Sequence, residues 1–541
     1  MIKNDTTAIF SFNLFNKHPA LKLGVPILVI ITTIVFLSLT NAVMHSSADP
    51  GEDAPEITWA KSFGGHDHEE FESVIAVSDG YVAVGRAYAD SFGDGDWDGV
   101  TAKGNYDAII VKFDLNGDVV WAKNFGGESV DAFYSVTADG SGYVAVGESY
   151  EGSFGTGDWT GVAGKGDFDA IIVKYDTDGN VEWKKNFGGS GEDVFFSVTT
   201  DDSGYVAVGW SYENSFGTGD WTGVTGKGGY DAIIVKFDVN GNVTWKKNFG
   251  GPGDDAFYSV TADSSGYVAV GASNSDSFGT GDWNDINGRG DEDAIIVKYS
   301  LNGNLTWAKN FGGVDNDCFE YVTADSSGYI VAGWSEASSF NTGDWDGIEE
   351  KGGDDATIVK FNKSGDVVWA KSFGGTGNDY FYSVTADGSG YVAAGLSFST
   401  SFGNGDWTGV AGKGHEDAIM VKYDADGSVV WKKSIGGSGS DYFYSVAADS
   451  SGYVVAGFSY IGSFGTGDWM GVSGNGHNDA TIMKLETAET EPTDPTDPTD
   501  PTDPTEPGSS GSGIMIWVGI AAVVIILAIV AVFLMIRYKT P

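Results

Sequence analysis

Apolar and polar residues alternate in short runs through residues 57–486. Four runs appear in one representative stretch: 119–123 (VVWAK), 133–137 (FYSVT), 143–147 (YVAVG) and 169–175 (DAIIVKY). A period of two places every second side chain on the same face, which is typical of β-strands. The 3.6-residue period of an amphipathic helix is absent from this region. The pattern therefore predicts an all-β fold.

Short turns rich in Asp and Gly separate these runs. Residues 138–142 read ADGSG and residues 176–180 read DTDGN. Such turns join neighbouring antiparallel strands, because Gly and Asp accept the backbone angles of a tight reversal. We therefore expect consecutive runs to pair as hairpins within one sheet.

Two tryptophan motifs recur along the chain with one fixed period. Every step between successive copies is 62 residues, without insertion or deletion. A fixed period of this size is typical of repeat architectures in which each copy is one structural unit. The motif W-x-K contains Trp59, Trp121, Trp183, Trp245, Trp307, Trp369 and Trp431, and the motif G-D-W contains Trp97, Trp159, Trp221, Trp283, Trp345, Trp407 and Trp469.

Four strands in each of seven units predict a seven-bladed β-propeller of four-stranded antiparallel blades. The last copy ends after residues 479–485 and lacks its own W-x-K strand, whereas residues 57–62 (ITWAKS) precede the first complete copy. We expect this N-terminal strand to complete the last blade. Such closure leaves no open sheet edge between the blades. The predicted propeller spans residues 57–486.

The two ends of the sequence predict membrane attachment. Residues 25–43 are apolar and follow several lysines, so residues 1–48 are interpreted as a cytoplasmic n-region with a signal peptide or signal anchor. Residues 514–536 carry no charge over 23 residues, long enough for a transmembrane helix. Basic residues within 537–541 predict a cytoplasmic tail, which places the propeller outside the cell.

Residues 487–513 connect the predicted propeller to the predicted membrane helix. They contain a T-D-P repeat followed by a Gly and Ser-rich segment. Proline at every third position favours the polyproline II conformation, and the aspartates repel one another. We expect an extended stalk.

Composition narrows the function. The chain has 541 residues, 76 acidic and 30 basic side chains, and a formal net charge of -46, which excludes nucleic acid as a natural partner. Gly is frequent, with 81 residues, but 41% of the residues are apolar, so a packed core is available. The single cysteine, Cys318, excludes an internal disulfide and a Cys-ligated zinc site.

The repeats resemble the β-propeller repeat family of surface proteins often called SBBP. The resemblance covers all seven copies and implies an extracellular propeller without assigned catalytic residues. A weaker likeness to quinoprotein-type blades, through Asp176, Gly179 and Trp183, implies that the W-x-K tryptophan docks between sheets. One SBBP-like copy carries Trp183, Phe187, Gly188, Gly189, Asp193, Gly204, Tyr205, Gly209, Asp231, Lys236, Asp238, Gly241 and Trp245.

The G-D-W loops are the first candidate for ligand binding. Together with the F-G-G turns they are expected on one face of the ring, here called the long-loop face, and the short Asp-Gly turns on the other. A carboxylate beside an indole suits a sugar, and seven weak sites would act together on a polymer. The alternative is that these residues pack between blades and cap turns. The candidate residues are Asp96, Trp97, Asp158, Trp159, Asp220, Trp221, Asp282, Trp283, Asp344, Trp345, Asp406, Trp407, Asp468 and Trp469.

Two sets of residues are candidate metal ligands. Asp158, Asp167 and Asp169 supply oxygen atoms of the kind that Ca²⁺ prefers, although their spacing is not that of an EF-hand. His415 and His477 occupy the same repeat position, and ring closure is expected to bring them toward the first F-G-G turn with its two histidines, His66 and His68. The alternatives are turn-capping aspartates and solvated loop histidines. No organic cofactor is expected.

The sequence shows no motif for a catalytic nucleophile, a phosphate loop or a zinc protease. We therefore expect a membrane-anchored cell-surface propeller that acts as a non-enzymatic binding or adhesion module for glycans or surface proteins. The alternatives are a structural component of the cell envelope and an extracellular glycan hydrolase or lyase.

Overall fold

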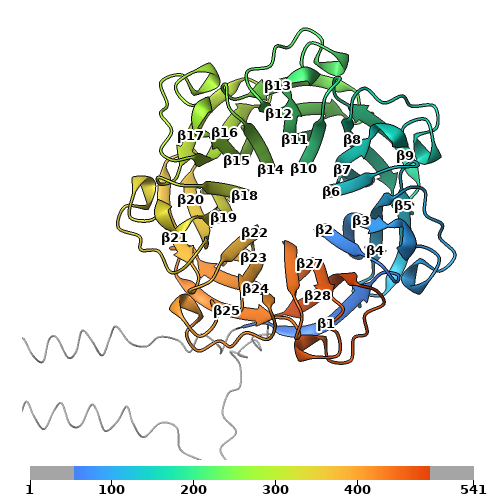
Figure 1. Cartoon of the computed structure of the whole chain (residues 1–541), viewed down its shortest axis with the longest axis vertical. Helices are drawn as coiled ribbons and strands as arrows, with labels where there is room; N and C mark the ends of the chain where they lie inside the picture. The colour runs from blue at the N-terminus through green and yellow to red at the C-terminus, as the bar shows by residue number, and fades with distance from the viewer. Residues whose placement is uncertain (1–53, 488–541) are drawn as a thin grey trace, which may run out of the picture. The chain divides into compact units, whose positions relative to one another are not determined.

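The computed structural model describes residues 54–487 as a ring of seven four-stranded antiparallel sheets around a central channel (Figure 1). Each sheet is one blade, and its first strand lies innermost. The predicted β-propeller and its blade count are confirmed. The predicted N-terminal segment 1–48, the transmembrane helix 514–536, the tail 537–541 and all of the stalk 487–513 except Thr487 lie outside the described residues.

The strands of the first four blades follow in chain order, from the channel outward. Blade 1 contains β2 (Glu69–Val77), β3 (Gly80–Tyr88), β4 (Tyr106–Phe113) and β5 (Val119–Phe125). Blade 2 contains β6 (Asp131–Ala138), β7 (Gly142–Tyr150), β8 (Phe168–Asp176) and β9 (Val181–Phe187). Blade 3 contains β10 (Asp193–Asp201), β11 (Gly204–Tyr212), β12 (Tyr230–Asp238) and β13 (Val243–Phe249). Blade 4 contains β14 (Asp255–Asp263), β15 (Gly266–Asn274), β16 (Glu292–Ser300) and β17 (Leu305–Phe311).

The remaining blades continue this order around the ring. Blade 5 contains β18 (Asp317–Ala324), β19 (Gly328–Ser335), β20 (Asp355–Asn362) and β21 (Val367–Phe373). Blade 6 contains β22 (Asp379–Ala386), β23 (Gly390–Phe398), β24 (Glu416–Asp424) and β25 (Val429–Ile435). Blade 7 contains β26 (Asp441–Ala448), β27 (Gly452–Tyr460), β28 (Asn478–Glu486) and, from the other end of the chain, β1 (Glu56–Phe63).

The pairing of β1 with β28 closes the ring, as the sequence predicts. The two strands run antiparallel, with Phe63 opposite Ala480 and Glu56 opposite Glu486. In Figure 1 the blue β1 lies along the outer edge of the last blade, beside the orange strands. Strands from both ends of the propeller therefore share one sheet, and opening the ring requires breaking their hydrogen bonds.

The hydrophobic core lies between neighbouring blades. One cluster combines Val144 and Ile172 of blade 2 with Phe195, Trp221 and other residues of blade 3. Successive apolar side chains of a strand point to opposite faces of the blade. Both faces are therefore apolar, and every blade packs against two neighbours. The same arrangement recurs around the ring, in keeping with the constant length of the repeat.

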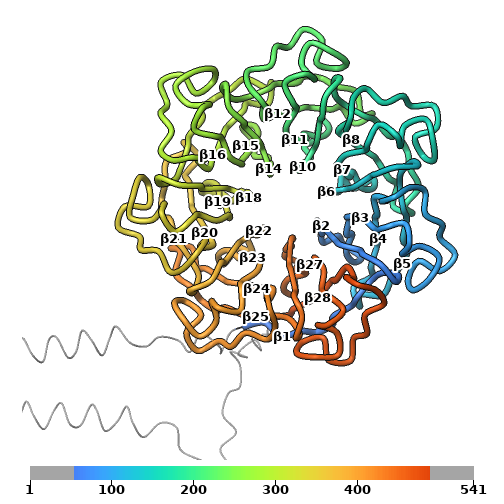
Figure 2. Tube along the Cα trace, viewed as in Figure 1, coloured from blue at the N-terminus to red at the C-terminus, as the bar shows by residue number. Residues whose placement is uncertain are grey.

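Connections divide between the two faces as the sequence predicts. The long β3–β4 type connections carry short 3-10 helices and meet the F-G-G turns, as shown by the hydrogen bond from Asp158 N to Gly126 O (2.8 Å). The long loops bulge from the rim of the ring in Figure 2. Within residues 54–487, no helix is long and apolar enough to cross a membrane.

Candidate functional site

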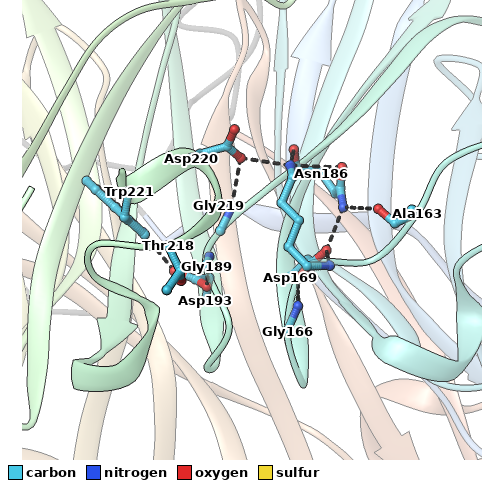
Figure 3. A network of polar contacts seen from close by, with 12 residues as sticks. Ala163, Gly166, Asp169, Asn186, Gly189, Asp193, Thr218, Gly219, Asp220 and Trp221 are labelled. Carbon is cyan, nitrogen blue, oxygen red and sulfur yellow. Dashed lines mark hydrogen bonds and ion pairs between the residues drawn. The ribbon is translucent and has the colours of Figure 1, made fainter. Parts of the chain in front are cut away.

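The seven G-D-W tryptophans are packing residues. Each indole is fully buried, with 0% of its surface exposed. Trp221 donates its Nε1 hydrogen to Asp193 Oδ1 (2.9 Å) and to Ser211 Oγ (3.0 Å), and Figure 3 shows it turned toward Asp193. The expectation that these indoles stack on a sugar is wrong, because no ring face reaches solvent. The alternative of packing between blades is the arrangement observed.

The aspartates of the same motif join neighbouring blades. Asp220 Oδ2 lies 2.7 Å from Lys165 Nζ and accepts a hydrogen bond from Gly188 N (3.1 Å). Equivalent ion pairs occur at six of the seven blade interfaces in the described ring. At the ring closure Asn475 stands where the cation is expected and reaches Asp96 Oδ2 at 3.4 Å. These carboxylates therefore have structural partners.

The proposed calcium ligands do not assemble into a site. Asp169 accepts hydrogen bonds from the backbone N–H groups of Lys165 (2.9 Å) and Gly166 (2.9 Å), while Asp158 pairs with Lys103 and Asp167 is exposed. Among the residues that the structure describes, no group of three or more His, Cys, Asp or Glu side chains is placed to hold a metal ion. The turn-capping alternative accounts for Asp169.

Ring closure brings together two of the four predicted histidines. His68 and His477 stack with their ring centres 5.3 Å apart and their planes 6° apart. His66 instead contacts Asp94 (2.8 Å), and His415 lies at the interface of blades 6 and 7, where its backbone N–H donates to Gly439 O (3.0 Å). The expected cluster of four histidines is therefore wrong, although the predicted contact across the closure is present.

The W-x-K tryptophans dock on the next blade, as the quinoprotein likeness implies. Trp183 donates its Nε1 hydrogen to Val239 O (3.2 Å), in the turn between β12 and β13. A Cβ atom added to Gly241 of that turn would lie 2.8 Å from the indole, so only glycine permits this contact. The W-x-K motif therefore contributes to packing between blades, as the G-D-W motif does.

The channel wall is one place where the repeats differ in chemistry. A β-bulge interrupts every inner strand, and the bulged residue faces the channel. Bulges re-aim side chains and are frequent beside functional sites. The opposing glycine permits the close approach, because a Cβ on Gly147 would lie 1.9 Å from Ala132 O. The seven bulged residues, called the channel ring, are Glu72, Tyr134, Phe196, Tyr258, Glu320, Tyr382 and Tyr444.

The channel ring is aromatic with two acids in non-adjacent blades. It lines a cavity of about 460 Å³. Burial, together with nearby Glu70, raises the pKa of Glu72 to about 8, although Arg86 opposes the shift. Burial also raises the pKa of Glu320, which accepts a hydrogen bond from Trp334 Nε1 (3.0 Å). Both acids therefore hold a proton more readily than a solvated glutamate does.

Next to the channel ring, the mouth of the channel on the long-loop face carries further residues that differ between blades. Here Tyr134 donates to Glu148 (2.8 Å), and Arg86 pairs with Glu70. The pair of residues opposite each other on the first two strands differs in every blade, from Glu70 and Arg86 in blade 1 to Tyr442 and Phe458 in blade 7. The channel mouth is therefore a site where the blades differ in chemistry.

The sequence already contained the signal for this site. The G-D-W and W-x-K motifs repeat in all copies, and repeated residues serve the packing that all blades share. The copies differ instead at the repeat position of Glu72, and this difference marks the channel ring.

No family model matches the chain. The regulatory protein FlaEY of Caulobacter vibrioides (strain ATCC 19089 / CIP 103742 / CB 15) is 26% identical over 235 residues, which are 40% of this chain and 23% of FlaEY, so the match spans about a quarter of that relative.

Among solved structures, the WD40 β-propeller domain of Doa1 aligns with 80% of this chain and 97% of its own, at 12% identity and a TM-score of 0.40. The β-propeller domain of the Trilobed protease from Pyrococcus furiosus covers 80% of this chain and 100% of its own, at 9% identity and a TM-score of 0.38. The seven-bladed propeller assignment rests on the strand pairing of this chain.

Proposed function

We propose that this protein is a non-enzymatic binding module whose partner docks on the long-loop face, over the mouth of the channel. One observation carries the proposal. The blades are nearly uniform where they pack against each other, and they differ where they face the channel. Uniform packing needs no variety, whereas recognition of an asymmetric partner needs different side chains at equivalent positions.

The chemistry of the mouth favours partners rich in hydroxyl or cationic groups. Aromatic rings at Tyr134, Tyr258 and Tyr382 supply apolar surface with a polar end, and Glu72 and Glu320 supply acceptors or shared protons. The formal net charge of -46 adds a general attraction for positive partners. Surface glycans and surface proteins both fall within this range.

The proposed location is the outer face of a membrane, with the propeller carried on the 487–513 stalk and anchored by residues 514–536. The apolar segments at both ends of the sequence support this topology. We also propose that the repeats of this chain are related to the SBBP-like surface repeats, because they carry the same motifs.

Binding is preferred over glycan hydrolysis because of the two channel acids. A hydrolase needs one carboxyl group that donates a proton and another that stays ionised. Burial raises the pKa of both Glu72 and Glu320, which disfavours the ionised form that one of them would need.

The test uses the full chain, purified in detergent and applied to arrays of glycans and surface proteins. The variant Glu72→Tyr with Glu320→Tyr gives these positions the residue found in four other blades. We expect it to remain folded, with a cooperative melting transition, and to lose at least about tenfold in affinity for the partner that the natural chain selects. Leu115→Ser, in an exposed turn on the opposite face, is the control. Unchanged affinity in the channel variant would reject the proposed site.

A further inference from the structure

A second cavity lies between blades 3 and 4, beside the channel on the long-loop face. Its volume is about 300 Å³, and Tyr258 lines both this cavity and the channel. We call it the blade 3–4 pocket. Its walls comprise Trp210, Tyr230, Asp254, Asp255, Ala256, Tyr258, Ala272 and Glu292.

Two small residues create this pocket. Ala256 and Ala272 face each other on β14 and β15. The corresponding pairs in the other six blades each contain at least one larger side chain: Glu70 with Arg86, Ala132 with Glu148, Val194 with Trp210, Cys318 with Trp334, Tyr380 with Leu396, and Tyr442 with Phe458. Blade 4 thus lacks the side chain that fills this position elsewhere in the ring.

One wall of the pocket is aromatic. The rings of Trp210 and Tyr230, on β11 and β12, meet edge to face with their centres 4.4 Å apart and their planes at 68°. Both side chains are partly exposed. The negative face of an indole attracts a cation placed over it, and the attraction increases when the cation leaves water.

The other wall carries carboxylates. Asp254 is tied to the aromatic wall, since its Oδ1 accepts a hydrogen bond from Tyr230 N (3.0 Å). Glu292 begins β16 and is partly buried. Burial raises its pKa to about 7, with nearby Glu320, Asp254 and Glu336 acting in the same direction. Nothing positive in the described structure offsets these effects.

At the position equivalent to Glu292 two blades further on, the acid has a hydrogen-bond donor. Glu416, at the start of β24, accepts a hydrogen bond from Ser440 Oγ. The residue of blade 4 that corresponds to Glu416 is Glu292, and it has aromatic rings and acids as neighbours instead. An acid beside an aromatic wall and an unfilled cavity matches a cation in both charge and shape.

We propose that the blade 3–4 pocket binds an organic cation, namely the guanidinium or ammonium group of a basic side chain on the partner. The aliphatic part of such a side chain occupies the space above Ala256 and Ala272. Its cationic group meets Glu292 and Asp254 and lies against the indole of Trp210. The proposal rests on the proposed function, because it assigns one anchor of the partner that docks at the channel mouth.

The probe is Nα-acetyl-arginine methylamide, titrated calorimetrically into the purified full chain, with the citrulline analogue as its neutral isostere. We expect the arginine probe to bind with a Kd on the order of 1 mM or tighter, and the citrulline probe at least about tenfold more weakly. Equal binding of the two probes, or no binding of the arginine probe, would overturn the proposal.

Three variants locate the probe. Ala272→Trp installs the side chain that blades 3 and 5 carry at this position and is expected to abolish binding, while Glu292→Gln is expected to weaken it about tenfold. Glu416→Gln is the matched control and is expected to change affinity less than twofold. Melting curves establish that each variant is folded, and Glu292→Gln decides the question if Ala272→Trp does not fold. Unchanged binding in Glu292→Gln would reject the pocket.

Different results would reject the blade 3–4 pocket and the proposed docking at the channel mouth. The arginine probe measures the blade 3–4 pocket without any partner, whereas the channel variant Glu72→Tyr with Glu320→Tyr measures partner docking. Loss of partner binding in the channel variant together with absent probe binding would reject the pocket alone.

Discussion

Lys165 of blade 2 and Asp220 of blade 3 form an ion pair of 2.7 Å across the interface between their blades. The lysine also donates to Asn186 O (2.6 Å), and the aspartate accepts from Gly188 N, so each charge is held by backbone as well. The G-D-W loop of one blade is thereby fastened to the long loop of the blade before it.

Removing the cation tests the strength of this connection. Lys165→Met keeps most of the apolar arm and leaves Asp220 without its partner. Since about a quarter of the lysine and a third of the aspartate are exposed, we expect a modest loss of about 1 kcal/mol in the free energy of unfolding. Denaturant unfolding measures it. Lys61→Met, whose exposed pair with Asp118 lies on an outer strand, is the control and is expected to change stability by less than about half as much.

The interface at which the ring closes lacks this ion pair, and a substitution can supply the missing positive charge. Asn475 occupies the position of Lys165 at the interface of blades 7 and 1, and it reaches Asp96 at 3.4 Å. Burial raises the pKa of Asp96, so a nearby cation is favourable there. We expect Asn475→Lys to increase the melting temperature by about 1–3 °C. A lower melting temperature in Asn475→Lys than in the natural chain would show that the closure is arranged differently from the other interfaces.

The buried indoles predict large losses of stability. Trp159→Ala removes a fully buried ring and both hydrogen bonds of its Nε1 atom, to Asp131 and Ser149 (3.0 Å each). We expect a loss of about 3–5 kcal/mol in the free energy of unfolding, measured with denaturant. Thr160→Ala, in the same loop and exposed, is the control. A stable Trp159→Ala variant with reduced glycan binding would contradict the packing role.

The architecture could be predicted because it depends on spacing alone. A constant 62-residue period, four alternating runs and a surplus strand at 57–62 require seven equal blades and a closed ring. Neither the seven-bladed fold nor the pairing of β1 with β28 depends on where a particular side chain points. These expectations therefore hold in the structure.

The site could not be predicted from motifs, because a motif does not state whether its residues are exposed. Asp220 and Trp221 have the composition of a sugar site, yet one is paired with Lys165 and the other is buried. The channel ring has no motif, since the bulge at Glu72 and its equivalents is a property of strand pairing. Pairing between strands determines burial, and burial decides which polar residues are available to a ligand.

Blade 1 contains a defect that substitution can repair. In blade 2, Asp131 accepts from the indole of Trp159 and from Ser149, but blade 1 has Glu69 and Ala87 at the two positions. Within the described structure, Trp97 Nε1, Glu69 Oε2 and Ser91 Oγ are buried without a hydrogen-bond partner. Unpaired buried polar groups each cost about 1–3 kcal/mol.

We expect Glu69→Asp with Ala87→Ser to restore this network and to stabilise the protein by about 1–3 kcal/mol. Denaturant unfolding of the double variant against the natural chain measures the gain. Ala87→Ser alone is the control, because it adds the hydroxyl but keeps the longer acid. A double variant less stable than the natural chain would contradict the proposed repair.

Buried acids also predict how stability depends on pH. Burial raises the pKa of Glu69 and Glu72 to about 8 and of Asp355 to about 7, above ordinary values of 4.5 for Glu and 3.8 for Asp. Between those values the folded protein holds more protons than the unfolded chain, so the free energy of unfolding falls as pH rises from about 5 to 8.

A second group of acids sets the lower limit of this window. Lys174 and Tyr205 hold the pKa of Asp139 well below its usual 3.8 despite partial burial, and equivalent aspartates recur around the ring. Their stabilisation is complete above about pH 4 and is lost as pH falls further. We expect the melting temperature to be highest near pH 4–5 and at least about 2 °C lower at pH 8. Glu69→Gln removes one raised acid and is expected to flatten the decline, whereas a melting temperature that rises from pH 5 to pH 8 would show that the buried carboxyl groups are stabilised as anions.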